Sequence, residues 1–145
     1  MGKEGKKKIV HLHLPKENYK TIMHAGRHEL IADEPQELGG ADTGPDPYDY
    51  LLMSLGSCSV ITMRMYAERK KWPLEDVYIE MRHYKTEAEE DGKSVNRDVI
   101  EKEITLVGEL DDQQTERIIE ISKRCPVHRT LLNSAEILTS GALKK

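Results

Sequence analysis

The pattern of apolar and polar positions predicts three short strands near the N-terminus. Residues 9–14 alternate as IVHLHL, and a second β-rich run over residues 19–25 follows a polar break containing a proline, which indicates a hairpin. A third strand is expected over residues 28–33. From residue 37 to 47 the sequence becomes ELGGADTGPDP, whose glycines and prolines predict a loop.

A long helix is expected to follow this loop, over residues 47–70. Asp46 is suited to cap it, Pro47 fits the first helical position, and Asp49 stands where a capping-box acid reaches back to the cap. An apolar stripe with spacings of four and three residues runs along the helix. It comprises Leu51, Leu55, Cys58, Thr62 and Met65.

The second half of the chain predicts two strands and then helices. Strands are expected over residues 77–84 and 99–110, joined by an acidic, glycine-containing loop over residues 87–94. A second amphipathic helix opens at Asp111, with Gln114 in the capping-box position. Its apolar side carries Ile118, Ile121 and Cys125.

The end of the chain completes the predicted order. Pro126 ends the second helix, a short helix covers residues 127–132, and residues 137–139 (ILT) form a last strand. The order β-β-β-α-β-β-α-α-β indicates an α+β domain with mostly antiparallel pairing.

Composition limits the classes of function. The 145 residues suffice for one domain with its own core, expected over residues 9–145 behind a basic, disordered tail over residues 1–8. A net charge of −4 without a concentrated basic face argues against binding of nucleic acid. No stretch has the length of a membrane span or the pattern of a signal peptide, so we expect a cytoplasmic protein with no membrane partner.

The chain has two cysteines, and several roles are open to them. A lone cysteine in an apolar helix is most often core filler. Cys58 and Cys125 lie 125 − 58 = 67 positions apart, which rules out a thioredoxin-like C-x-x-C pair. Cys125 and His128 offer only half of a zinc site, and His11 and His13 are better explained as exposed strand residues. No motif demands a metal or a cofactor.

A peroxidatic pair is the remaining chemistry. One thiolate attacks an O–O bond and becomes a sulfenic acid, and the second thiol condenses with it to form a disulfide. Such a thiolate needs a nearby cation. Cys58 lies about three turns into its helix, beyond the reach of the helix dipole. The candidate cations in the sequence are Arg27, Arg124 and Arg129.

Two segments together resemble the OsmC/Ohr family of thiol-dependent peroxidases, which reduce organic hydroperoxides. They are GGADTGPDPYDYLLMSLGSCSVITMRMYAERKKWPL and KRCPVHRTL. The resemblance covers nearly the whole chain from about Arg27, and is greatest to the OsmC-like branch. It implies an OsmC-like fold, with antiparallel sheets wrapped around a long central helix that bears a cysteine, in an intertwined homodimer.

The resemblance also implies roles for individual residues. Cys58 would be the peroxidatic cysteine and Cys125 the resolving one, with Arg27 as the thiolate-stabilising arginine. Ohr enzymes carry a glutamate directly after the last proline of the loop, where this chain has Tyr48. Asp49 follows one step later and is either a substitute for that glutamate or simply the acid of the helix start, whereas Tyr48 is a candidate to line a substrate pocket.

Three hypotheses of function therefore stand. The first is reduction of organic hydroperoxides, with a dithiol reductant of the lipoyl type. The second is a redox-sensing or small-molecule-binding protein with little turnover, which the tyrosine at position 48 favours. The third is a structural or partner-binding module with inert cysteines. In each case the breadth of the apolar stripe around Leu51, Leu55 and Met65 predicts a homodimer.

Overall fold

The computed structural model describes residues 5–144, which form two compact units, one reaching to Leu51 and the other beginning at Leu52. The basic tail expected over residues 1–8 lies half outside the described residues, and residues 5–8 have no regular secondary structure. The expectation of a single domain over residues 9–145 stays a prediction.

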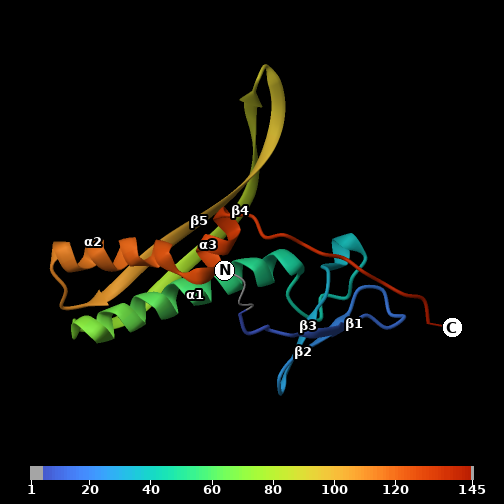
Figure 1. Ribbon diagram of the computed structural model, residues 1–145, viewed down its shortest axis with the longest axis horizontal. Coiled ribbons are helices and arrows are strands. Elements are labelled where there is room, and N and C mark those ends of the chain that lie inside the picture. Colours follow the sequence, from blue (N-terminus) through green and yellow to red (C-terminus); the bar gives the residue numbers. More distant parts are fainter. Residues whose placement is uncertain (1–4, 145) are drawn as a thin grey trace. The chain divides into compact units, whose positions relative to one another are not determined.

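The first unit contains a three-stranded antiparallel sheet in the order β1-β2-β3 (Figure 1). Its strands are β1 (His11–His13), β2 (Thr21–Ala25) and β3 (His28–Ala32). Gly26 starts the tight turn between β2 and β3 with φ of 59°, a conformation that glycine adopts without strain. The three predicted strands are confirmed, each shorter than its hydrophobic run.

The loop after β3 is organised around the buried carboxylate of Asp33. This carboxylate accepts hydrogen bonds from the Glu34 amide at 2.8 Å and from the Thr43 amide and hydroxyl at 3.1 and 2.5 Å. A side chain at Gly40 would place its Cβ 2.0 Å from the Glu34 carbonyl oxygen, so only glycine fits there. A short 3-10 turn, η1 (Gln36–Leu38), lies within the same loop.

The long helix α1 (Pro47–Lys70) has the predicted bounds. Asp46 and Asp49 form the predicted capping box, because each backbone amide donates to the other side chain, at 3.0 and 2.8 Å. Along the predicted apolar stripe, Leu55 is buried within the chain, whereas Met65 is 58% exposed. The buried face of α1 includes small residues as well as large ones. Its members are Leu55, Gly56, Ser59, Met63, Tyr66 and Ala67.

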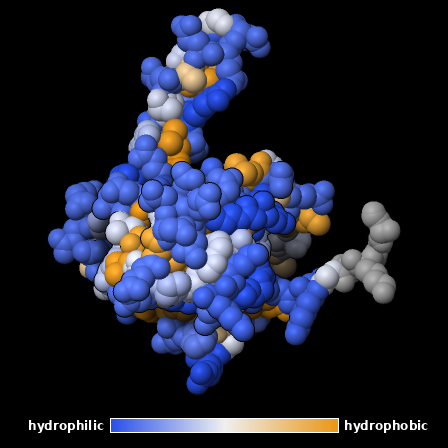
Figure 2. All heavy atoms as spheres, turned by 90° about the vertical axis from the view of Figure 1, so that its left-hand side faces the viewer, coloured by the Kyte–Doolittle hydropathy of each residue, from blue (hydrophilic) through white to orange (hydrophobic). Residues whose placement is uncertain are grey.

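Two long antiparallel strands, β4 (Leu74–Glu90) and β5 (Lys93–Gly108), form a hairpin. The predicted loop over residues 87–94 was wrong, because the strands continue to a two-residue turn at Asp91 and Gly92. Both turn residues have positive φ, 50° and 75°, which suits a tight hairpin. Figure 1 shows the hairpin extending beyond the helices of its unit, and Figure 2 shows its far end as mostly hydrophilic.

The C-terminal helices differ from the prediction in detail. Helix α2 (Asp112–Ile121) begins with the predicted capping box, but it continues into a 3-10 turn, η2 (Ser122–Arg124). Helix α3 (Pro126–Leu132) then follows. The predicted strand over residues 137–139 was wrong: the segment has no regular structure, and Ile137 is 84% exposed. A short run with β-strand propensity does not form a strand when no sheet edge pairs with it.

The core of the second unit joins α1, α2 and the base of the hairpin. Figure 1 shows α1 and α2 running side by side. The buried cluster comprises Met63, Tyr66, Ala67, Leu74, Ile118 and Ile121. Together with the antiparallel sheets, this arrangement confirms an α+β fold with a long helix that carries Cys58. Among the described residues, no helix combines the length and apolar character needed to cross a membrane.

We predict that Asp33→Asn lowers the free energy of unfolding at neutral pH. The Thr43 hydroxyl and then the Glu34 amide hold the pKa of Asp33 below its ordinary value. A carboxylate with a lowered folded-state pKa stabilises the fold above the ordinary carboxyl pKa, and this contribution is lost as pH falls through the lowered value. The difference between wild type and variant should therefore be largest near neutrality and shrink in acid.

Urea unfolding followed by circular dichroism across this pH range measures the effect. Glu37→Gln is the matched control, because it removes an exposed carboxylate from the same loop and should change stability little. A difference between wild type and Asp33→Asn that stays constant down to acid pH would contradict the prediction.

Candidate functional site

The structure brings Cys58 and Cys125 together within the second unit. Cys58 lies on α1 and is partly exposed, whereas Cys125 lies just before α3 and is fully buried. Both thiols are free. The two groups are close enough that each shifts the pKa of the other. This proximity meets the first requirement of a redox-active pair.

The sequence Cys-Pro-Val-His fixes the position of the Cys125 sulfur. Cys125 is the N-cap of α3 in extended backbone conformation, and Pro126 occupies the first helical position. The Cys125 sulfur takes the place of the usual N-cap oxygen and accepts a hydrogen bond from the His128 amide, at 3.3 Å. Placing Cys125 at the end of the preceding helix was therefore wrong.

Two polar side chains that the sequence analysis missed complete the site. Ser59 is fully buried beside Cys58, and its Oγ lies 3.6 Å from the Cys125 sulfur. The ammonium group of Lys102, on β5, donates to the Ser59 Oγ at 2.8 Å and to the Ser122 carbonyl at 3.0 Å. A signal for Lys102 was present in the sequence, because it interrupts the apolar side of its strand between Ile100 and Ile104.

The electrostatic environment separates the two thiols. Burial raises the pKa of Cys58, and its interaction with Cys125 raises it further. Burial also opposes ionisation of Cys125, but hydrogen bonds from Ser59, the His128 amide and Cys58, with the charge of Lys102, lower its pKa overall. Of the two thiols, Cys125 is therefore the one whose surroundings favour the ionised form, whereas those of Cys58 favour the protonated form.

The side chain of His128 is held neutral. Burial lowers its pKa, and the charges of Lys102 and Lys123 act in the same direction. Its Nδ1 atom is buried and has no hydrogen-bond partner among the described residues. Over residues 5–144 no three histidine, cysteine, aspartate or glutamate side chains lie together so as to hold a metal ion.

The other candidate residues are each described within their own unit. Arg124 and Arg129 are exposed, and the charge of Arg124 acts on Tyr66. Arg27 is exposed in the turn between β2 and β3 of the first unit. The first unit also holds Tyr48, which is 49% exposed. The fifth predicted residue, Asp49, is engaged in the helix cap of α1. The involvement of Arg27, Tyr48 and Asp49 in a site stays a prediction.

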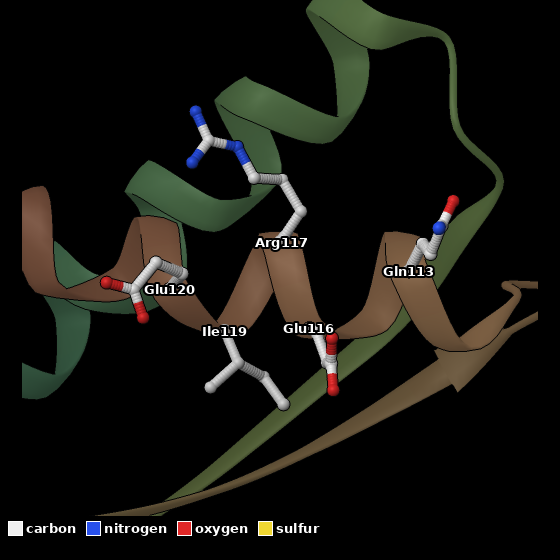
Figure 3. Close-up of a pocket in the computed structure, with 5 residues that line it drawn as sticks. All are labelled: Gln113, Glu116, Arg117, Ile119 and Glu120. Atoms are coloured by element: carbon white, nitrogen blue, oxygen red, sulfur yellow. The ribbon is translucent and has the colours of Figure 1, made fainter.

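A surface hollow on α2 is separate from the thiols. It is lined by Gln113, Glu116, Arg117, Ile119 and Glu120. Figure 3 shows Arg117 reaching toward α1 while Ile119 points away from it. Arg117 donates to the Tyr66 hydroxyl at 3.0 Å, so it stabilises the packing of the two helices. No cysteine or histidine is among these lining residues, and the thiol pair remains the candidate site.

Comparison with known proteins identifies the family and the fold of the chain. The family model described as OsmC-like protein matches residues 39–140. Among curated proteins no sequence matches the chain. Among solved structures, the OsmC-like protein of Mycoplasma pneumoniae superposes with a TM-score of 0.71 at 21% identity, over 89% of each chain.

Two further solved structures carry names that state a role. An organic hydroperoxide resistance protein OsmC of Legionella pneumophila gives a TM-score of 0.65 at 21% identity, over 89% of this chain and 91% of that one. An organic hydroperoxide resistance protein of Elizabethkingia anophelis gives a TM-score of 0.64 at 16% identity, over 89% of this chain and 91% of that one. At such identities the likeness shows the shared fold alone.

Proposed function

Because the chain belongs to the OsmC-like family, we propose that it is a thiol-dependent peroxidase that reduces organic hydroperoxides. The observation that carries the proposal is the adjacent pair of free thiols, one partly exposed and one buried with three hydrogen-bond partners. The names of the Legionella and Elizabethkingia structures support the same chemistry.

The difference in exposure supports the roles proposed for the two cysteines. Cys58 is the partly exposed thiol and is the one a hydroperoxide reaches, whereas Cys125 is fully buried behind it. The Cys58 sulfur attacks the outer oxygen, the O–O bond breaks, and an alcohol and a sulfenic acid result. Cys125 then attacks the Cys58 sulfur, the S–O bond breaks, water leaves and a disulfide forms.

A dithiol closes the cycle by reducing this disulfide through thiol–disulfide exchange. A reductant of the lipoyl type fits the family resemblance, and the cycle needs no cofactor. Arg27, Tyr48 and Asp49 enter the proposal from that resemblance: Arg27 as a cation for the Cys58 thiolate, and Tyr48 and Asp49 as residues of the substrate pocket. Asp49 already fills its structural role in the helix cap.

A redox sensor is the second candidate, and the raised pKa of Cys58 favours it. A thiol that is mostly protonated attacks peroxides slowly, because the thiolate is the nucleophile. The two candidates differ in their behaviour once the first disulfide has formed. A peroxidase continues to consume peroxide when a dithiol is supplied, whereas a sensor reacts once and keeps its oxidised state.

We also propose that the chain forms a homodimer, intertwined as the family resemblance implies. Apolar side chains of α1 and β4 stay exposed in the second unit: Met53 is 48%, Ile61 51%, Met65 58% and Tyr78 63% exposed. Large apolar side chains gathered on one helix in this way are typical of an interface. A second copy of the chain would bury them.

The two serine variants should fail in different ways. Cys58→Ser should consume no hydroperoxide above background, because serine offers no thiolate and Cys125 is buried. Cys125→Ser should react once and accumulate a sulfenic acid on Cys58, which excess peroxide converts to the sulfinic acid. Mass spectrometry after one equivalent of cumene hydroperoxide detects the added oxygen atom and locates it.

The double variant Cys58→Ser/Cys125→Ser is the control for oxidation of methionine. Rapid addition of oxygen to Cys125 in the Cys58→Ser protein, at the wild-type rate, would show that the roles are reversed. Absence of any reaction at either cysteine in the wild type would remove the proposed function altogether.

Sedimentation tests the proposed assembly. At micromolar concentration we expect a homodimer, with an interface above about 2,000 Å² in total, the size typical of obligate dimers. Met65→Glu should shift the equilibrium toward monomers, because it places a charge at the exposed apolar face of α1. Glu68→Gln, at an exposed position of the same helix, is the control. A folded wild-type monomer at this concentration would contradict the proposal.

A further inference from the structure

Lys102 occupies a position where an ammonium group is costly. Along β5 its side chain points to the same side as Ile104 and Leu106, both of which pack against the buried core. Moving an ionised group away from water is unfavourable unless the protein supplies partners for it. The partners of Lys102 therefore indicate why it is there.

These partners include no carboxylate among residues 5–144. The ammonium group donates to the Ser59 Oγ and to the Ser122 carbonyl, and both are neutral. Burial lowers the pKa of Lys102, while the charges of Cys125 and Cys58 act in the opposite direction. Among the groups that act on Lys102, the thiols of Cys125 and Cys58 are therefore the ones that can carry a compensating negative charge.

The Ser59 hydroxyl connects the cation to the sulfur. An ammonium group can only donate, so the Ser59 Oγ must accept from Lys102. Its own single proton has two acceptors within reach, the Leu55 carbonyl at 2.9 Å and the Cys125 sulfur at 3.6 Å. If Cys125 is ionised, the Ser59 hydroxyl can donate its hydrogen bond to the sulfur. If Cys125 is protonated, its thiol donates to the Ser59 Oγ, and the Ser59 hydroxyl donates to the Leu55 carbonyl.

Every other group that faces the Cys125 sulfur also favours its ionised form. The His128 amide donates to it from α3, and the Cys58 thiol does so from α1. The His128 side chain is neutral, and Lys123 on η2 acts on Lys102 and His128. No acidic side chain of the described residues acts on the sulfur.

We propose that Lys102, acting through Ser59, holds Cys125 as a thiolate, and that this thiolate takes the proton of Cys58 when Cys58 attacks a hydroperoxide. The second clause rests on the proposed function, whereas the first does not. Lys102 and Ser59 are positioning residues, since neither contacts the peroxide.

The protons and electrons of this cycle balance. As the Cys58 sulfur bonds to the outer oxygen, its proton passes to the Cys125 thiolate, and the departing alkoxide takes a proton from water to become the alcohol. Cys125 then bonds to the Cys58 sulfur, and its proton leaves with the hydroxide of the sulfenic acid as water. Two electrons pass from the sulfurs to the O–O bond, and the external dithiol returns them.

The test measures the Cys125 thiolate without any peroxide. In the Cys58→Ser variant Cys125 is the single thiol, and ultraviolet absorbance of the thiolate against pH follows its ionisation even though it is buried. Adding Lys102→Gln should move this titration upward by at least about one pH unit, equivalent to roughly 1.4 kcal/mol of lost thiolate stabilisation. Adding Ser59→Ala should move it in the same direction.

Two variants serve as controls. Lys102→Arg keeps the positive charge and should retain most of the low-pH titration. Lys123→Gln removes the charge of a neighbouring, exposed lysine that has no contact with Ser59, and it should leave the titration nearly unchanged. The Cys58→Ser/Cys125→Ser protein supplies the baseline, and circular dichroism verifies that each variant is folded.

The outcomes separate this inference from the proposed function. An unchanged titration in a folded Lys102→Gln protein, or an equal shift in Lys123→Gln, would overturn the role of Lys102, and an unchanged titration in Ser59→Ala would overturn the route through Ser59. If the Lys102→Gln protein fails to fold, the titration of the Ser59→Ala protein decides the test, because this substitution removes a single oxygen atom and disturbs the packing least. If the titration of Cys125 shifts as expected but the wild-type protein does not reduce peroxides, the role of Lys102 is upheld and the proposed function is rejected.

Discussion

The Lys102 ammonium group, set on the apolar side of β5 without a carboxylate partner, requires anionic or strongly polar neighbours. The rest of the site is arranged to supply them. Ser59 accepts one hydrogen bond and the Ser122 carbonyl accepts another, and the sulfur of Cys125 lies on the far side of Ser59. A cation, a hydroxyl and a thiol from three different elements thus share one partly dehydrated site.

Small residues on α1 make this arrangement possible. Met81 and Lys102 are directly opposite each other in the hairpin, so their side chains lie on the same face. A Cβ at Gly56 would lie 3.1 Å from the Met81 side chain, which shows how closely β4 approaches the helix. Ser59 lies one turn further along α1 and meets Lys102. The register of the hairpin therefore places the cation at the thiols.

Much of the fold could be predicted where the signal is local. The capping residues correctly predicted where α1 and α2 begin, because a helix cap depends only on neighbours within four residues. The lengths of β4 and β5 were underestimated. Their outer parts are hydrophilic, which is typical of a loop, but charged cross-strand partners such as Lys85 and Asp98 stabilise them as strands. The cation was sought among the arginines of the chain, whereas it is Lys102 that the register of the hairpin brings to the cysteines.

The central claim is that Cys58 and Cys125 act as one redox pair, and the stoichiometry of a single turnover tests it most directly. Reduced wild-type protein is mixed with a small excess of cumene hydroperoxide, and lost peroxide, lost thiols and disulfide-linked peptides are counted. The account predicts one peroxide consumed and two thiols lost per chain, with Cys58 joined to Cys125 within the same chain. Loss of one thiol, or disulfides only between chains, would contradict it.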